Sequence, residues 1–195
     1  MLAILISVRS EWCEKTINGL KITEIRKGTA LFKAINKLIE KQGVAPVFIY
    51  CTKDKKMPLV RDIDGSIVLA NEHYAYCDEE LNGKVIAKYN ATAEEINPKD
   101  IWQSCSSNPF DIQNYEECEL CKNSCLSFVE LDNYLCGEKG TAVHIHDLQV
   151  FDKPKELSEF KVKHYPQYAG FVKNKTHYEL VPLTRAPQSW FYIEI

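Results

Sequence analysis

The sequence lacks a long apolar run and a large excess of either charge. Its most apolar stretch is residues 1–8, and Arg9 and Glu11 follow at once. This run is too short to span a bilayer and no basic leader precedes it, so we expect a cytoplasmic protein without a membrane anchor. The net charge is only −3, which argues against a strongly basic nucleic-acid-binding protein.

Several catalytic motifs are also missing. The sequence has no phosphate-binding glycine loop, no hydrolase nucleophile elbow and no dinucleotide-binding fingerprint. Its composition, 45% hydrophobic and 26% charged over 195 residues, is that of an ordinary globular protein and can bury the core of one domain. We therefore expect a single domain over residues 1–195.

Charge is nevertheless distributed unevenly along the chain. Residues 1–61 carry twelve basic and five acidic residues, residues 62–136 carry four and fifteen, and residues 137–195 carry eight and seven. A basic amino-terminal portion can attract phosphate while an acidic middle repels it, so any nucleic-acid contact should be local. The alternative is that folding mixes these segments and leaves no charged patch.

The periodicity of apolar residues predicts an α+β fold. Strands are expected near residues 2–8, 22–26, 47–52, 66–69, 83–91, 140–151 and 189–195, and helices near 10–18, 29–42, 127–135 and 156–160. Strands separated by turns, with a few covering helices, indicate a small mixed barrel. Residues 92–126 interrupt this pattern with proline, asparagine, acidic residues and cysteine, and we interpret them as an acidic, Cys-rich insertion.

A group of charged residues lies between the first predicted strand and the long helix. Gly19, Lys21, Glu24 and Arg26 form the pattern Gly-x-Lys-x-x-Glu-x-Arg, and the last two share one face of any strand that carries them. Ions beside the isoleucines of this segment need a partner or a ligand. The segment is therefore either a solvated edge strand with an ion pair or part of a binding site.

These residues carry a resemblance to a known family. The run from Ile4 to Lys27, with its Gly-x-Lys-x-x-Glu-x-Arg motif, resembles the start of an ASCH domain, a branch of the PUA-like barrels. Residues 141–160 and 185–190 resemble the longer ASCH proteins often found in phage and low-GC bacteria. Together these blocks cover about half of the chain, and the resemblance implies a PUA-like mixed β-barrel with covering helices.

The resemblance also implies a cleft that binds RNA, a nucleobase or a modified nucleoside. Lys21 and Arg26 can contact phosphate or a base acceptor, and Glu24 can accept a hydrogen bond from an exocyclic amine. Trp190 or Tyr192 can stack on a base. The other ligand-binding residues that we expect are Arg185, Gln188 and Ser189.

An enzyme is the alternative interpretation. Some small ASCH proteins hydrolyse N4-acetylcytidine with the motif lysine, a threonine and a distant glutamate; Lys21 matches that lysine, and Glu24 replaces the threonine. Lys21 and Glu24 would then be the catalytic residues of an amidohydrolase or a ribonuclease. A carboxylate close to Lys21 favours a charged ammonium, and therefore favours binding over lysine-led catalysis. A third interpretation is an interaction protein whose acidic insertion mimics nucleic acid.

The eight cysteines are the second group of interest. In a cytoplasmic protein they favour metal or core positions over a disulfide framework. Cys118-x-x-Cys121-x-x-x-Cys125 begins with zinc-knuckle spacing, and Cys105 or Cys136 can supply a fourth ligand for a structural zinc. The alternative is a helical turn whose cysteines pack on one side. Small core positions are expected for Cys13, Cys51 and Cys77.

Two histidines lie two residues apart on a predicted strand. His144 and His146 can in principle share a metal, but partly exposed positions on the sheet are the commoner role of such residues. His73, His164 and His177 have no spacing that indicates a site. The sequence does not indicate an oligomeric state.

Overall fold

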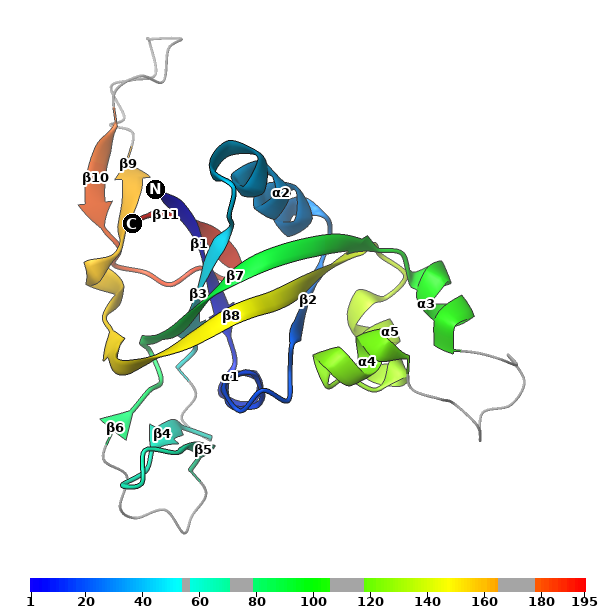
Figure 1. Ribbon diagram of the computed structural model, residues 1–195, viewed down its shortest axis with the longest axis horizontal. Helices are drawn as coiled ribbons and strands as arrows, with labels where there is room; N and C mark the ends of the chain where they lie inside the picture. Colours follow the sequence, from blue (N-terminus) through cyan, green and yellow to red (C-terminus); the bar gives the residue numbers. More distant parts are fainter. Residues whose placement is uncertain (54–56, 71–78, 106–117, 165–177) are drawn as a thin grey trace. The chain divides into compact units, whose positions relative to one another are not determined.

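The computed structural model describes residues 1–53, 57–70, 79–105, 118–164 and 178–195, with the backbone alone for residues 102–105 (Figure 1). These residues form two compact units. The first unit consists of Met1–Cys13, Pro46–Lys88 and Gln149–Ile195, and the second of Glu14–Ala45 and Tyr89–Leu148. Each unit therefore combines segments that are far apart in the sequence. The prediction that residues 1–195 form one domain stays a prediction.

Most strands belong to the first unit. They are β1 (Leu2–Val8), β3 (Pro46–Cys51), β4 (Leu59–Arg61), β5 (Ile67–Leu69), β6 (Glu79–Glu80), β9 (Lys161–His164), β10 (Glu179–Pro182) and β11 (Trp190–Glu194), with the short 3₁₀ helix η1 (Leu157–Glu159). The second unit holds β2 (Thr23–Lys27), α2 (Ala30–Gln42), α3 (Pro98–Cys105), α4 (Glu119–Ser124) and α5 (Phe128–Leu135). Helix α1 (Ser10–Ile17) and strands β7 (Val85–Ile96) and β8 (Gly140–Lys155) have residues in both units.

The strands pair mostly in antiparallel fashion. In the first unit the strand order is β10-β9-β11-β1-β3-β7-β8, and in the second it is β7-β8-β2. Strand β1 is antiparallel to β11 and parallel to β3, so that Ile4 lies between Tyr192 and Val47. The result is the expected α+β fold with a large, mostly antiparallel sheet. Neither order is closed among the described strands, and a barrel therefore stays a prediction.

Strand β1 is the central strand that the sequence predicts. Its residues from Ala3 to Val8 are all buried, as expected of a strand covered on both faces. The pairing of β1 with β11 also confirms the predicted strand at residues 189–195. A core cluster in the first unit contains Ala3, Leu5, Phe48, Tyr50, Val85, Phe160, Leu183 and Ile193.

The helices of the second unit begin and end largely as predicted. Helix α2 ends at Gly43, which has the left-handed φ of 81° and donates its N–H to Ile39 O at 2.8 Å. Helix α5 begins with the predicted capping box between Ser127 and Glu130. It ends at Leu135, as predicted, and the left-handed residue that follows the helix is Cys136, with a φ of 52°.

The predicted insertion begins too early. Strand β7 continues to Ile96, so residues 92–96 are part of the sheet, because β7 pairs with the long strand β8. Helices α3 and α4 account for most of the other described residues of 92–126. Strand β8 is likewise longer than expected and runs through Pro154 to Lys155. His73, Cys77 and His177 lie outside the described residues.

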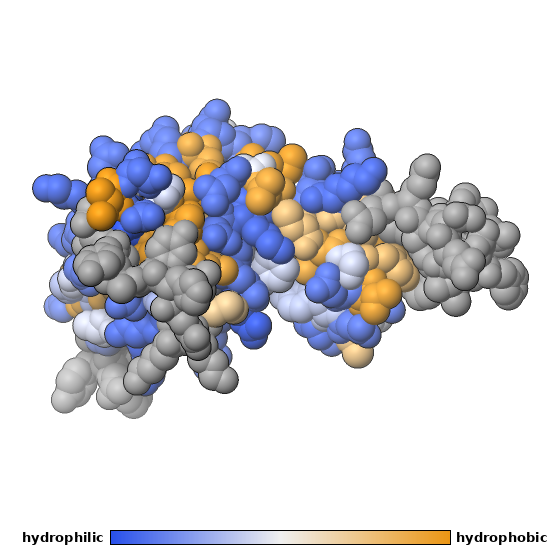
Figure 2. Space-filling model, turned by 90° about the horizontal axis from the view of Figure 1, so that it is seen from below, coloured by the Kyte–Doolittle hydropathy of each residue, from blue (hydrophilic) through white to orange (hydrophobic). Residues whose placement is uncertain are grey.

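Hydrophilic and hydrophobic residues are interspersed on the face drawn in Figure 2. Large apolar residues that are exposed include Leu20, Ile63 and Val129, and scattered exposed apolar residues are normal for a folded protein. No helix among the described residues is long and apolar enough to cross a bilayer.

Candidate functional site

The predicted charged motif begins in a tight turn between α1 and β2 in the second unit, which holds Gly19 and Lys21, and continues on β2 with Glu24 and Arg26. Gly19 has a φ of 73°, a conformation that glycine adopts without the strain that a Cβ would cause. The backbone N–H groups of Leu20 and Lys21 both donate to Lys15 O, at 2.9 and 3.0 Å. Lys21 therefore lies in the turn that connects the end of α1 to the start of β2.

Lys21 is buried, with only 3% of its surface exposed. Its Nζ donates to Thr23 O at 2.9 Å and to Ser124 O at 3.2 Å, and it lies 3.2 Å from Glu24 Oε2. An ammonium group has three N–H donors, and three acceptors surround this one. These contacts offset the cost of removing the charge from water.

Glu24 joins the two basic residues of the motif. One carboxylate oxygen faces Lys21, and Oε1 lies 2.9 Å from Arg26 Nε. Glu24 is 9% exposed, whereas its neighbour Ile22 is 46% exposed. The interpretation as a solvated edge strand is therefore wrong in one respect: β2 pairs only with β8 among the described strands, but Glu24 is buried and Arg26 is partly buried. We name Lys21, Glu24 and Arg26 the ion network.

Tyr89 lies close to the ion network and was not expected there. It comes from β7 and is buried, and its burial raises the pKa of its hydroxyl, which the Glu24 carboxylate raises further and Arg26 lowers. The hydroxyl therefore stays neutral. The sequence placed Tyr89 only in the predicted strand at residues 83–91; the need of a buried tyrosine hydroxyl for a polar neighbour was the available signal.

Helix α4 holds the turn that carries Lys21. Besides the bond from Lys21 to Ser124 O, the Ile22 N–H donates to Asn123 O at 2.9 Å and the Cys125 thiol donates to Leu20 O at 3.2 Å. Three successive residues of the turn are thus bound by three successive residues at the end of α4. Sequence reasoning missed this contact because about a hundred residues separate the two segments.

The opposite face of β2 carries a second polar group. The register of β2 and β8 pairs Thr23 with His144 and Glu24 with Val143, so His144 shares the face of Thr23 while Glu24 points to the other face. His144 Nδ1 lies 3.3 Å from Thr23 Oγ1, and its Nε2 lies 3.4 Å from Glu94 Oε1.

His146 has a different partner from His144. Its Nε2 lies 2.9 Å from Thr92 Oγ1. His144 is partly buried and His146 is exposed, in line with the predicted role as partly exposed sheet residues. Among the described residues, no three histidine, cysteine or acidic side chains are grouped in a way that could hold a metal ion.

The structure brings together two of the predicted zinc ligands. Cys118 Sγ and Cys121 Sγ are 3.4 Å apart, whereas the sulfur of Cys125 contacts Leu20 O. Cys105 lies in α3, and its side chain is outside the description. Cys136 is exposed. The zinc site therefore stays a prediction. The expected core positions of Cys13 and Cys51 are confirmed, since both are fully buried.

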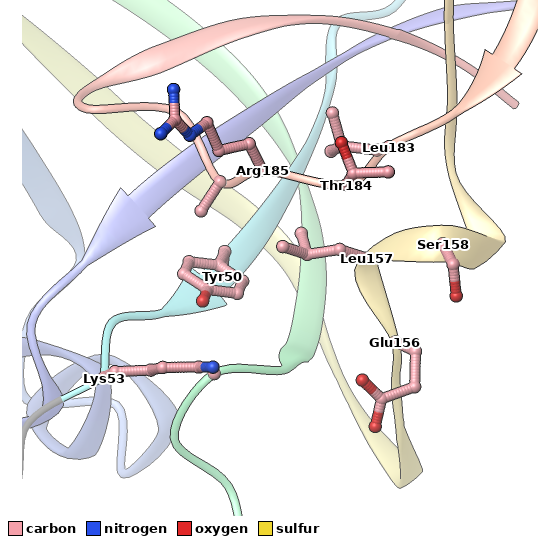
Figure 3. A pocket seen from close by; sticks show the side chains of 10 residues that line it. Tyr50, Lys53, Glu156, Leu157, Ser158, Leu183, Thr184 and Arg185 are labelled. Carbon is pink, nitrogen blue, oxygen red and sulfur yellow. The ribbon is translucent and has the colours of Figure 1, made fainter.

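Arg185 lines a cavity in the first unit. The cavity has a volume of about 550 Å³, and its lining includes Tyr50, Lys53, Glu156 and Arg185. Figure 3 shows the Tyr50 ring between Lys53 and Arg185. Burial raises the pKa of the Tyr50 hydroxyl, and the charges of Cys51 and Glu156 raise it further. The cavity thus combines an aromatic wall with side chains of both charges.

The other residues predicted with Arg185 lie near β11. A second cavity of about 610 Å³ shares Arg185 and adds Tyr192, and Trp190 packs edge-on against Tyr192 with ring centroids 5.8 Å apart. Ser189 O accepts a hydrogen bond from Ser7 N at 2.9 Å, and Gln188 is exposed. Neither cavity is lined by Gln188, Ser189 or Trp190. These residues and Arg185 belong to the first unit, and the ion network belongs to the second.

Comparison with solved structures settles the fold. A point variant of the ASCH protein from Zymomonas mobilis matches with a TM-score of 0.51 and 17% sequence identity, over 98% of this chain and 90% of that chain. This chain has the ASCH fold. The ASCH protein from Zymomonas mobilis itself gives a TM-score of 0.49 at 17% identity, over 98% of this chain and 87% of that chain.

A third solved structure is less similar, and the two sequence comparisons found no match. The N-terminal domain of Staphylothermus marinus McrB matches with a TM-score of 0.42 and 11% identity, over 93% of this chain and 87% of that chain. No protein-family model and no curated protein matches the sequence significantly. The ASCH fold is thus established by structure, and the roles of single residues have to be argued from this chain.

Proposed function

We propose that this ASCH fold binds RNA or a modified nucleoside, and that the ion network is the centre of recognition. The observation that carries the proposal is one connected group of ions at the start of strand β2, in which Lys21 and Glu24 are buried and Arg26 is partly buried. Burying an ion pair often contributes little stability compared with apolar residues of similar size. A network of this kind is therefore better explained by a requirement for fixed polar groups than by stability alone.

The three residues have different roles in this proposal. Lys21 is a positioning residue, because its ammonium is surrounded by protein acceptors. Glu24 is held between two cations, which fixes the direction of its carboxylate. The side chain of Arg26 is the most exposed of the three, at 14%, and its planar guanidinium suits phosphate oxygens or the acceptor edge of a base.

The contacts of Lys21 favour binding over lysine-led catalysis. A neutral amine has two N–H donors and a lone pair, so one of the three surrounding oxygens would face that lone pair. The arrangement of Thr23 O, Ser124 O and Glu24 Oε2 therefore suits the charged form of Lys21. A lysine in this state is neither a nucleophile nor a base.

The first unit carries a separate part of the proposal. We propose Arg185, Gln188, Ser189 and Trp190 as ligand contacts within the first unit by itself. Arg185 supplies a cation at the wall of two cavities, and Trp190 supplies a partly exposed aromatic ring of the kind on which bases stack.

Binding is tested by fluorescence anisotropy with labelled single-stranded RNA, and by calorimetry with N4-acetylcytidine. Arg26→Gln is expected to weaken binding by roughly tenfold or more, the effect of losing a bidentate or charge-assisted contact. Lys27→Gln is the matched control, because it removes the same charge from the exposed next residue and should change only the salt dependence. Equal affinities of the Arg26→Gln variant and the unmodified protein for both ligands would refute the proposal.

A hydrolase is the second candidate function. The observation that favours it is the chain of contacts from Thr23 through His144 to Glu94, in which a histidine placed between a hydroxyl and a carboxylate can act as a general acid or base. Lys21 and Glu24 remain the catalytic residues predicted for this alternative. Cleavage of RNA or release of acetate from N4-acetylcytidine should disappear in His144→Ala and persist in His146→Ala. Activity that survives in His144→Ala would exclude this role of His144.

A further inference from the structure

Cys118 and Cys121 lie close enough to react with each other. Their sulfur atoms are 3.4 Å apart, and a disulfide bond is about 2.05 Å long, so an approach of about 1.4 Å would join them. Cys118 is the residue before α4 and Cys121 lies within the helix. The Cys-x-x-Cys spacing is common to metal sites and to dithiol redox sites, and the structure must decide between them.

The two sulfurs differ in accessibility. Cys121 is buried and Cys118 is partly exposed, and both pack into the cluster of Ile25, Leu131 and other apolar residues. A partly exposed thiol can meet a reagent from solution, whereas a buried thiol can be reached only by its neighbour. This pairing of an accessible with an inaccessible sulfur is typical of an attacking and a resolving cysteine.

The other described cysteines do not compete with this pair. Cys13 and Cys51 are fully buried in the first unit. The thiol of Cys125 is directed at Leu20 O, and Cys136 lies at the far end of α5. Among the six cysteines whose side chains the structure describes, Cys118 and Cys121 bring their sulfur atoms into contact, at 3.4 Å.

We propose that Cys118 and Cys121 are a dithiol redox site whose co-reactant is a low-molecular-weight disulfide such as oxidised glutathione. The Cys118 thiolate attacks one sulfur of the reagent, the reagent's S–S bond breaks, and one reagent thiol leaves with a proton. The Cys121 thiolate then attacks Cys118 Sγ and releases the second reagent thiol. The protein loses two electrons and two protons, and the reagent gains them as two thiols.

The proposal is tested on the intact chain by thiol titration and peptide mapping after incubation with oxidised glutathione. The expected result is the loss of two titratable thiols, a Cys118–Cys121 disulfide in the mapped peptide, and recovery of both thiols with a reductant. Cys121→Ser should trap a glutathione adduct on Cys118, because the resolving thiol is missing. Cys125→Ser is the matched control and should still form the disulfide.

Three results would overturn the proposal. A glutathione adduct that persists on Cys118 of the unmodified protein would show that Cys121 does not resolve it. A disulfide that joins Cys118 or Cys121 to a different cysteine would show that the observed proximity does not govern the reaction. If elemental analysis finds one equivalent of zinc, and this zinc is lost only when Cys118 and Cys121 are both replaced, the pair is a metal site. The unmodified protein alone decides the first two outcomes, so a variant that folds poorly cannot obscure them.

Discussion

Replacing Lys21 tests whether the ion network holds the turn before β2. In Lys21→Met an unbranched side chain one atom shorter replaces the lysine and the charge is removed, so Thr23 O and Ser124 O lose a donor and Glu24 loses one of its two cations. Removing one partner of a buried ion pair typically costs about 3–5 kcal/mol. Because Arg26 remains 2.9 Å from the carboxylate, we expect the lower end, about 3 kcal/mol.

That loss is large enough to measure reliably. For a chain of 195 residues, about 3 kcal/mol corresponds to a decrease in Tm of roughly 6–12 °C. The assay is urea and thermal unfolding followed by circular dichroism. Lys37→Met, on the exposed face of α2, is the control and should change the free energy of unfolding by no more than about 0.5 kcal/mol. The reasoning fails if Lys21→Met costs no more than Lys37→Met.

Three further predictions concern single residues. Ser127→Ala should lower the free energy of unfolding by about 1 kcal/mol, because it removes the capping box of α5. Hydrogen bonds from Ser127 hold the pKa of Glu130 below the ordinary glutamate value. Acid unfolding should therefore show that the capping box stabilises the protein fully above the ordinary pKa and that this contribution is lost as the pH falls through the lowered pKa. Burial raises the pKa of Tyr89 in the folded protein, so the free energy of unfolding should be unaffected by this residue below the ordinary tyrosine pKa and should decrease as the pH rises above it. Because Tyr89→Phe has no hydroxyl to ionise at this position, the variant should unfold less readily in alkali. Gly83→Ala should cost about 1 kcal/mol, because Gly83 has a φ of 82° and its Cβ would lie 2.8 Å from Lys53 Cε; a melting temperature equal to that of the unmodified protein would contradict this.

Local patterns predicted most of the helices and strands. The apolar residues of β1, the glycine after α2 and the capping box of α5 each act within a few residues of the chain, which is the range that periodicity and capping rules cover. The lengths of β7 and β8 were underestimated because the pairing that extends them is not visible in one segment. Burial in the turn before β2 was left open by the sequence for a related reason: α4, which is distant in the sequence, contacts Lys21, and Ile22 is left exposed.

In the candidate site, too, residues that are close in the sequence could be grouped in advance, whereas residues that are far apart could not. Lys21, Glu24 and Arg26 could be grouped from the sequence because they lie within six residues. Tyr89 and Ser124 join them only through the fold, and no spacing rule connects positions so far apart. Cys125 was grouped with Cys121 by spacing, but its left-handed φ of 56° turns the chain at the end of α4, and its sulfur contacts Leu20 O.

The burial of Lys21 also makes it a natural reporter of local opening. Amine-reactive acylating reagents modify exposed lysines freely, but they can reach Lys21 only when its bonds to Thr23 O and Ser124 O are broken. The rate at which Lys21 becomes acylated therefore measures how often the turn separates from α4, a motion that lies below global unfolding in free energy. Mass spectrometry of the single peptide that carries the acyl group can follow that motion, and exposed Lys37 on the same chain provides the intrinsic rate for comparison.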